Sequence, residues 1–212
     1  MTRNYIFGSG AYARLLSRAL VDGNVQTLDG FWVEKELKQA ESIEGYSVSS
    51  NPEDLFSARV FVGVTLQKRK GPDIWRRVAD LIVTNGGFVG GFCAGSVDTQ
   101  HISKTACVYK FVNIEMDAVI GELCHVRSNV YIGHGVELGE CCYIAPSASI
   151  GSCCHIAGDA FIGFGAVVLP ERTIGSNVVI AGGAVIAKDV PANSVVLRDG
   201  TIVRKKNPFV FI

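Results

Sequence analysis

One hydrophobic position recurs at every sixth residue through the second half of the chain. From Ile102 to Ile186, every sixth residue is Ile, Leu or Val. A second column, two residues before each aliphatic one, runs from Ala106 to Ala184 and contains Ala, Val or Cys except at Arg172. A six-residue repeat that turns one large and one small residue inward is typical of a parallel β-helix. We therefore predict a solenoid over residues 102–186.

The residue after the repeated aliphatic side chain is often glycine. These positions are Gly121, Gly133, Gly139, Gly151, Gly163 and Gly175. Glycine adopts a positive φ at little cost, which tight turns require. We expect these glycines to use a positive φ in the turns between short strands.

The chain before the repeat has a different pattern. Its apolar runs predict strands over residues 3–8, 25–35 and 58–64, and helices over residues 8–20 and 71–86. This alternation of strand and helix is typical of an α/β domain. We predict a Rossmann-like α/β domain over residues 1–98, followed by a β-helix domain with a C-terminal extension over residues 99–212.

A glycine-rich turn connects the first predicted strand to the first predicted helix. Gly8, Gly10 and Ala13 form a G-x-G-x-x-A pattern. Backbone N–H groups at such a helix start suit a phosphate group. The same turn can instead serve only to let the strand and the helix pack closely. The pattern therefore allows a phosphate site without requiring one.

The charge balance gives no reason to expect a nucleic acid or an anionic membrane as a partner. The 212 residues contain 20 Lys and Arg against 20 Asp and Glu, and the isoelectric point is about 6.9. No export signal and no apolar run of membrane-spanning length is present in the sequence. We expect a cytoplasmic protein that binds small molecules.

The repeat resembles that of the hexapeptide-repeat acyltransferases. In that superfamily the chain forms a left-handed parallel β-helix with three hexapeptides in each coil. The resemblance implies about five coils of about eighteen residues each here. The fold class expected for the whole chain is thus a Rossmann-like domain followed by a left-handed β-helix.

Two cysteine pairs lie within the repeat, in GECCYIAPSASIGSCCHIAG, residues 139–158. Cys142 and Cys154 fall in the inward column, whereas Cys141 and Cys153 precede them by one residue and are predicted to face outward. Twelve residues are two thirds of a coil, so the two pairs lie on different faces and cannot converge on one metal ion. Seven cysteines without an export signal also argue against a disulfide framework. We predict reduced structural thiols and no metal.

The whole chain resembles the bacterial nucleotide-sugar acyltransferases grouped with sialic acid O-acetyltransferase. The matching features are the glycine turn at Gly8, the strand that ends in GFWVEK, the hexapeptide domain, and the segment KDVPAN at residues 188–193. This resemblance implies acetyl-CoA as donor, a homotrimer with acetyl-CoA bound between subunits, and a nucleotide-linked amino sugar as acceptor. The expected acceptor is a 4-amino-4,6-dideoxy sugar, acetylated by direct attack of its amino group on the thioester.

We predict two sets of binding residues for these substrates. The nucleotide sugar is expected at Gly8, Ser9, Gly10, Ala11, Glu34, Gly63, Val64 and Tyr143. Acetyl-CoA is expected at Ser152, Phe164, Gly182, Lys188 and Pro191. Within the second set, Gly182 is expected to meet the pantetheine and Lys188 the nucleotide phosphates.

The family's general base is a histidine, matched here by His134 in HGVELG. Histidine suits this role because its ordinary pKa lies near neutral pH. The acidic residue that commonly follows the base is replaced by Gly135, and a second family histidine is replaced by Tyr143. One coil of eighteen residues places Met116 beneath His134, so its neighbour Asp117 is the predicted residue that orients the imidazole.

One coil above His134 stands Ser152, whose backbone N–H is the predicted donor to the oxyanion of the attacked thioester. The rival interpretation is that the Ser152 hydroxyl acts as a nucleophile. His125 and His155 each precede an inward aliphatic residue and are interpreted as structural.

Other functions remain open at this point. O-acetylation of a sugar, or transfer of another acyl group, needs the same base and the same groove. A nucleotide-sugar-binding trimer without catalytic activity is a further alternative. The β-helical carbonic anhydrases typically have two histidines five residues apart, a spacing that this sequence lacks.

Overall fold

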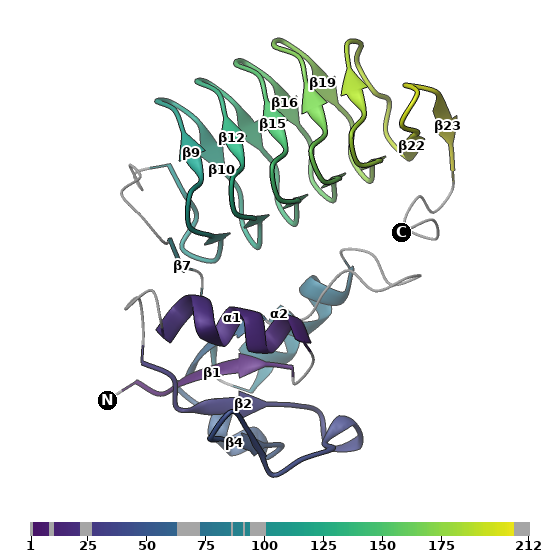
Figure 1. The fold of residues 1–212 in the computed structure, drawn as a ribbon. Helices are drawn as coiled ribbons and strands as arrows, with labels where there is room; N and C mark the ends of the chain where they lie inside the picture. Colours follow the sequence, from purple (N-terminus) through teal and green to yellow (C-terminus); the bar gives the residue numbers. More distant parts are fainter. Residues whose placement is uncertain are drawn as a thin grey trace. The chain divides into compact units, whose positions relative to one another are not determined.

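The computed structural model describes residues 2–8, 11–21, 27–62, 73–85, 87–90, 92–93 and 101–205. The chain divides into two compact units (Figure 1). The first unit comprises residues 1–66 and 73–90, and the second comprises residues 67–72 and 91–212. The long segment of the second unit begins at residue 91, whereas the boundary was expected at residue 98.

The first unit contains one six-stranded sheet in the order β3-β4-β2-β1-β5-β6. Its strands are β1 (Asn4–Phe7), β2 (Gly30–Trp32), β3 (Ser42–Ile43), β4 (Tyr46–Ser49), β5 (Arg59–Val62) and β6 (Phe88–Gly90). All neighbours are parallel except the β3–β4 hairpin. The helices are α1 (Ala11–Val21) and α2 (Asp73–Thr84), with short 3₁₀ turns η1 (Lys35–Leu37) and η2 (Pro52–Leu55).

The predicted strands and helices of this unit are present, although β2 is shorter than expected. The hairpin of β3 and β4 was not predicted, because its strands are short and mostly polar; it turns at Glu44 and Gly45, which both have positive φ. The fully buried residues Ile6, Phe31 and Phe61 come from three neighbouring strands. Central parallel strands of this kind are buried on both faces, and so their sequences read as continuous apolar runs.

The second unit is a parallel β-solenoid of the kind found in left-handed β-helices (Figure 1). After β7 (Phe92–Cys93), its short strands are β8 (Cys107–Val108), β9 (Asn113–Ile114), β10 (Val119–Ile120), β11 (His125–Val126), β12 (Tyr131–Ile132), β13 (Glu137–Leu138), β14 (Tyr143–Ile144), β15 (Ser149–Ile150), β16 (His155–Ile156), β17 (Phe161–Ile162), β18 (Val167–Val168), β19 (Thr173–Ile174), β20 (Val179–Ile180), β21 (Val185–Ile186), β22 (Ser194–Val196) and β23 (Ile202–Arg204).

These strands stack into three sheets, one for each face of the solenoid. We call them face B (β23-β22-β20-β17-β14-β11-β8-β7), face C (β10-β13-β16-β19) and face D (β21-β18-β15-β12-β9). Tyr131 pairs with Ser149, and Ser149 pairs with Val167, so that equivalent positions in successive coils are eighteen residues apart. The coil length expected from the resemblance is therefore confirmed.

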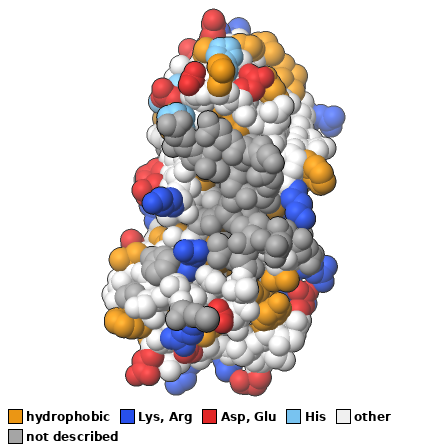
Figure 2. Space-filling view, turned by 90° about the vertical axis from the view of Figure 1, so that its left-hand side faces the viewer, with side chains coloured by type: hydrophobic (Ala, Val, Ile, Leu, Met, Phe, Trp, Pro, Cys, Tyr) orange, Lys and Arg blue, Asp and Glu red, His pale blue; other side chains and the backbone are white. Residues whose placement is uncertain are grey.

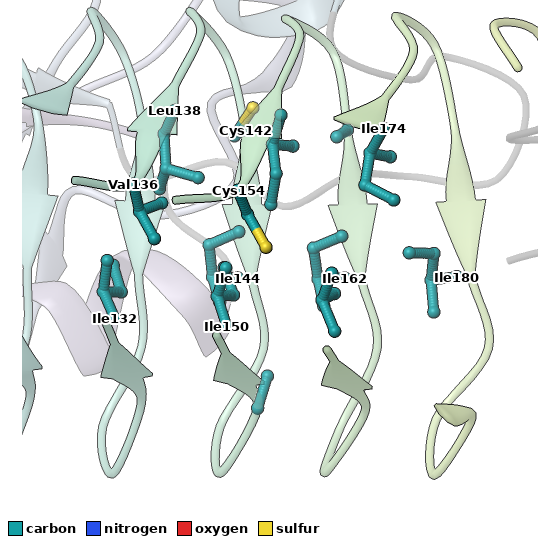
Figure 3. Packing of buried hydrophobic residues seen from close by; sticks show 14 of the residues in the cluster. Ile132, Val136, Leu138, Cys142, Ile144, Ile150, Cys154, Ile162, Ile174 and Ile180 are labelled. Carbon is teal, nitrogen blue, oxygen red and sulfur yellow. The ribbon is translucent and has the colours of Figure 1, made fainter. Parts of the chain in front are cut away.

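The two hydrophobic columns of the sequence form the core of the solenoid (Figure 3). Aliphatic residues such as Ile132, Ile144 and Ile150 are completely buried, and Cys142 and Cys154 lie among them as small apolar side chains. Free cysteine commonly behaves in this way. The inward prediction for these two cysteines is confirmed.

The glycines that follow the aliphatic residues do not adopt the positive φ that we expected. Positive φ instead recurs three residues after each repeated aliphatic residue from Val108 to Ile180, at Phe111, Asp117 and Asn129 among others, and only some of these positions are glycine. A Cβ on Gly121 would approach the carbonyl carbon of Gly139 to 2.7 Å, and one on Gly133 would approach the Ser152 nitrogen to 2.6 Å. These glycines are therefore required by the close stacking of coils.

Cys141 and Arg172 differ from the simple pattern of the repeat. Cys141 is 1 % exposed and does not face outward, in contrast to Cys153, which is exposed as predicted. Leu123 and Asp159 occupy the equivalent turn positions of the adjacent coils, so Cys141 lies between two stacked side-chain positions. Arg172, which interrupts the small column, turns outward, where Nε donates to the Pro170 carbonyl and the guanidinium lies 3.7 Å from Asp189.

Among the residues that the structure describes, no helix is both long enough and apolar enough to cross a membrane.

Candidate active site

His134 lies on the turn that leads from face D to face C, two residues after the end of β12. Its side chain is 56 % exposed, so it points away from the core as predicted. The backbone N–H of Gly135 donates to the Met116 carbonyl, and the N–H of Cys153 donates to the His134 carbonyl. Met116 and Ser152 therefore occupy the equivalent positions below and above His134, as the coil length predicted.

Glu115 is the carboxylate beside His134. Its Oε2 accepts a hydrogen bond of 2.9 Å from the His134 backbone N–H and lies 3.9 Å from the imidazole Nδ1. Its Oε1 accepts a hydrogen bond of 2.8 Å from the Tyr131 hydroxyl, which raises the pKa of that tyrosine. Two hydrogen bonds therefore hold the carboxylate in one position against the histidine.

Asp117, the predicted orienting residue, is not the acid that the structure brings to the imidazole. It occupies a turn position with a φ of 59°, and no contact with His134 is found for it among the described residues. Sequence reasoning missed Glu115, although Glu115 precedes His134 by one coil and one residue. A side chain from the coil below therefore supplies the carboxylate that is missing at position 135, where glycine replaces the acidic residue.

The other nitrogen of the imidazole faces a thiol. The Sγ of Cys153 lies 3.7 Å from His134 Nε2. Cys153 is the exposed member of the described free cysteines, whereas Cys107, Cys124, Cys141, Cys142 and Cys154 are buried. Sequence reasoning predicted that Cys153 faces outward but did not connect it with the histidine.

The backbone amide of Ser152 stands close to the same turn. It packs against Gly133, where even a Cβ would come within 2.6 Å of the nitrogen. The Ser152 carbonyl accepts from the Glu171 N–H, but the Ser152 N–H has no backbone acceptor among the residues that the structure describes. A free N–H near the histidine is what an oxyanion donor needs.

Tyr143, a predicted acceptor-binding residue, lies on face B and not beside His134. Its ring stacks on Phe161 at 5.4 Å, and its hydroxyl accepts a hydrogen bond of 2.9 Å from Arg127. Burial raises the pKa of Tyr143, while Arg127 acts in the opposite direction. Within one chain, Tyr143 and His134 are therefore separated by a change of face.

The predicted acetyl-CoA residues fall into separate groups on the solenoid. Phe164 and Gly182 stack on the turn between faces B and D, where the Gly183 N–H donates to the Phe164 carbonyl. Phe164 is 64 % exposed. Lys188 follows β21 as Ser152 follows β15, so it belongs to the same turn column as His134. Pro191 lies near the last coil, with its carbonyl carbon 3.0 Å from the position of a Cβ on Gly175.

The nucleotide-sugar residues predicted in the first unit are only partly described. Gly8 directly follows β1 and has a φ of 112°, a conformation that favours glycine. Glu34 follows β2, and its Oε2 lies 3.4 Å from Arg77. Ala11 begins α1. Ser9, Gly10, Gly63 and Val64 lie outside the described residues.

The remaining histidines differ in their surroundings. His155 is exposed on face C and lies 3.0 Å from Glu137. His125 is buried, and burial together with the Arg127 charge lowers its pKa to about 3. Within the described part of the chain, no group of three His, Cys, Asp or Glu side chains is arranged to hold a metal ion.

Both polar and apolar side chains are exposed in the coils around His134. Figure 2 shows histidine, acidic and hydrophobic side chains together on one face of the molecule. Met116, one coil below His134, is 75 % exposed, and Val119 on face C is 42 % exposed. The candidate site is therefore an open surface with apolar neighbours.

Comparison with known proteins agrees with this architecture. Residues 117–152 match the bacterial transferase hexapeptide family. A comparison with curated proteins gave no match. Among solved structures, perosamine N-acetyltransferase from Caulobacter crescentus, a histidine variant in complex with CoA and GDP-perosamine, matches with a TM-score of 0.82 and 20 % identity, over 96 % of this chain and 97 % of that one.

Two other solved structures match nearly the whole chain. The acetyltransferase domain of PglB from Neisseria gonorrhoeae, in complex with acetyl coenzyme A, has a TM-score of 0.79 and 19 % identity, over 92 % of this chain and 96 % of that one. WeeI from Acinetobacter baumannii has a TM-score of 0.77 and 18 % identity, over 96 % of this chain and 100 % of that one. The narrower grouping with sialic acid O-acetyltransferase stays a prediction. The chain therefore carries the bacterial transferase hexapeptide repeat at residues 117–152 and has the fold of these acetyltransferases.

Proposed function

We propose that this protein is an acetyl-CoA-dependent N-acetyltransferase that acts on the amino group of a nucleotide-linked amino sugar. The observation that carries the proposal is the exposed His134, with the carboxylate of Glu115 beside Nδ1. One coil above lies the Ser152 N–H, which has no backbone acceptor among the described residues. The fold shared with perosamine N-acetyltransferase and the PglB domain supports the donor and the class of acceptor.

His134 acts as the general base in this proposal. The amino group loses a proton to the imidazole as it attacks the carbonyl carbon of an acetyl thioester. Glu115 holds the ring in place and stabilises the imidazolium that forms, as the acid of a catalytic triad does. The Ser152 N–H stabilises the negative charge that develops on the carbonyl oxygen.

The acceptor is proposed to bind to the first unit, whose parallel strands β4, β2, β1, β5 and β6 and helices α1 and α2 support a Rossmann-like assignment. Gly8 and the start of α1 offer backbone N–H groups for the phosphates, together with the predicted residues Ser9, Gly10, Glu34, Gly63 and Val64. Acetyl-CoA is proposed to contact Phe164, Gly182, Lys188 and Pro191.

The proposal is tested by measuring release of free CoA with a panel of amino and hydroxy nucleotide sugars. We expect release with an amino sugar nucleotide and a fall in kcat of at least about a hundredfold for His134→Gln. His155→Gln is the matched control, because His155 is also exposed and also faces a carboxylate. Release with hydroxy sugars alone would identify an O-acetyltransferase, and no release with any acceptor would favour a binding protein without catalytic activity.

A further inference from the structure

The thiol of Cys153 occupies the place beside His134 that a nucleophile needs. Its Sγ lies 3.7 Å from Nε2, a distance within hydrogen-bond range for sulfur. On the other side of the ring, Glu115 Oε2 lies 3.9 Å from Nδ1 and accepts from the His134 backbone N–H. Nucleophile, base and orienting carboxylate in this order form the arrangement found in enzymes with covalent intermediates.

The surroundings of Cys153 differ from those of the core cysteines. The Sγ atoms of Cys124, Cys142 and Cys154 lie inside the solenoid and contact backbone carbonyl oxygens. Cys153 is exposed, and burial does not keep its sulfur from a substrate. The φ of 56° at Cys153 belongs to the turn position that recurs every six residues, so it reflects the regular coil and not local strain.

The turn below leaves space for this thiol. Gly135 occupies the equivalent position one coil earlier, and a Cβ there would lie 3.6 Å from Cys153 Sγ. A longer side chain at position 135 would therefore compete with the sulfur for the space beside the imidazole. With Gly135 in that place, the base faces a thiol on one nitrogen and an acid on the other.

We propose that Cys153 accepts the acetyl group from acetyl-CoA and then passes it to the acceptor, an inference that rests on the proposed acetyl-transfer function. In the first step, His134 takes the thiol proton and the sulfur attacks the carbonyl carbon. The bond from that carbon to the CoA sulfur breaks, and the departing CoA thiolate receives the proton from His134. The products are S-acetyl-Cys153 and free CoA.

The second step returns the enzyme to its starting state. The amino group of the acceptor attacks the S-acetyl carbonyl, and His134 takes one amine proton. The bond from carbon to the Cys153 sulfur breaks, and the thiolate is reprotonated by the imidazolium. Because S-acetyl-Cys153 is also a thioester, the role of His134 as base is the same in both steps. Kinetics of the double-displacement type are expected.

The decisive experiment omits the acceptor. Full-length protein is mixed with acetyl-CoA and quenched in acid, and its intact mass is measured. We expect a gain of one acetyl group per chain, located at Cys153 by peptide mapping and removed by hydroxylamine. A burst of free CoA equal to the number of chains should accompany it. Direct attack of the acceptor on acetyl-CoA, as predicted from the sequence, produces neither.

Three variants separate the roles of the residues. Cys153→Ala should form no S-acetyl protein and should lower kcat/KM with the amino sugar nucleotide by at least about a hundredfold. His134→Gln should slow acetylation of Cys153 by a similar factor. His155→Gln should acetylate Cys153 at the normal rate, and thermal unfolding of each variant shows that the fold is retained.

The possible results distinguish this proposal from the proposed function. If Cys153→Ala keeps normal turnover and the wild type forms no S-acetyl protein, the Cys153 intermediate is overturned while the acetyltransferase assignment stands. If S-acetyl-Cys153 forms but no sugar nucleotide is acetylated, the Cys153 site stands and the proposed acceptor is wrong. Acetylation at a buried cysteine in place of Cys153 would also overturn the proposal.

Discussion

Glu115 connects three groups around the candidate base. It accepts hydrogen bonds from the Tyr131 hydroxyl and the His134 N–H, and it faces Nδ1 at 3.9 Å. A carboxylate in this position fixes the ring and stabilises its protonated form. We expect Glu115→Gln to lower kcat by more than about tenfold, while the KM for acetyl-CoA changes little. Free CoA release in the presence of the acceptor measures both quantities.

Asp117→Asn is the matched control for this substitution. Asp117 lies two residues away on the same turn, carries the same charge, and has no contact with the imidazole among the described residues. The control should keep its turnover. Equal losses in the two variants would point to the net charge of the turn and not to a contact with His134.

The buried His125 should make the free energy of unfolding depend on pH. Burial and the Arg127 charge lower its folded pKa to about 3, whereas an unfolded histidine titrates near pH 6.5. Between these values only the unfolded chain binds the proton, so the free energy of unfolding falls as the pH decreases below 6.5. This histidine alone should remove about 2 kcal/mol between pH 7 and pH 5.

Urea unfolding of the wild type and of His125→Gln over this range tests that sign. The variant lacks the titrating group, so its free energy of unfolding should depend less steeply on pH. A variant with the same slope as the wild type would show that His125 is protonated in the folded state or that other groups dominate.

At the scale of the element, the turn between faces D and C depends on close stacking of coils. A Cβ on Gly133 would come within 2.6 Å of the Ser152 nitrogen, so one of the two backbones must move in Gly133→Ala. Either movement changes the position of the Ser152 N–H, the proposed oxyanion donor, relative to His134. We expect a loss in kcat of about a hundredfold to a thousandfold, whereas Ser152→Ala, which keeps the amide, should change little.

Gly121→Ala separates the catalytic effect from the general cost of the clash. It places a Cβ 2.7 Å from the Gly139 carbonyl carbon on the turn between faces C and B, away from His134. Both variants should be less stable in thermal unfolding. Only Gly133→Ala, which moves the Ser152 amide relative to His134, should also have the lower kcat. Similar kinetic losses in both would assign the effect to the solenoid as a whole.

The sequence was sufficient to predict the coils but not the contacts of the site. The repeat predicted the inward columns because each hexapeptide must bury one aliphatic and one small residue, and three hexapeptides give the backbone register of eighteen residues. The side chains of the site meet at a spacing of nineteen residues, from Glu115 to His134 and from His134 to Cys153. Exposed side chains lean diagonally across the coils, and so the backbone register pointed to Met116 and Ser152.

In the whole molecule, the residues that a single site is expected to use lie on different edges and faces of the solenoid. His134 lies on the turn between faces D and C, Phe164 lies on the turn between faces B and D, and Tyr143 lies on face B. Side chains that point outward from different edges of one solenoid diverge. If one site uses both residues, a second copy must bring Phe164 to His134, as the predicted homotrimer would.

Co-expression of two inactive variants tests this arrangement directly. His134→Gln lacks the base, and Phe164→Glu places a negative charge at an exposed position proposed to contact acetyl-CoA. If each site combines His134 of one chain with Phe164 of the next, random mixing in a cyclic trimer restores about a quarter of the sites. The mixture should then recover about a quarter of wild-type turnover, and light scattering should give the mass of three chains. Mixtures no more active than either variant, or a fully active monomer at micromolar concentration, would show that each chain builds its site alone.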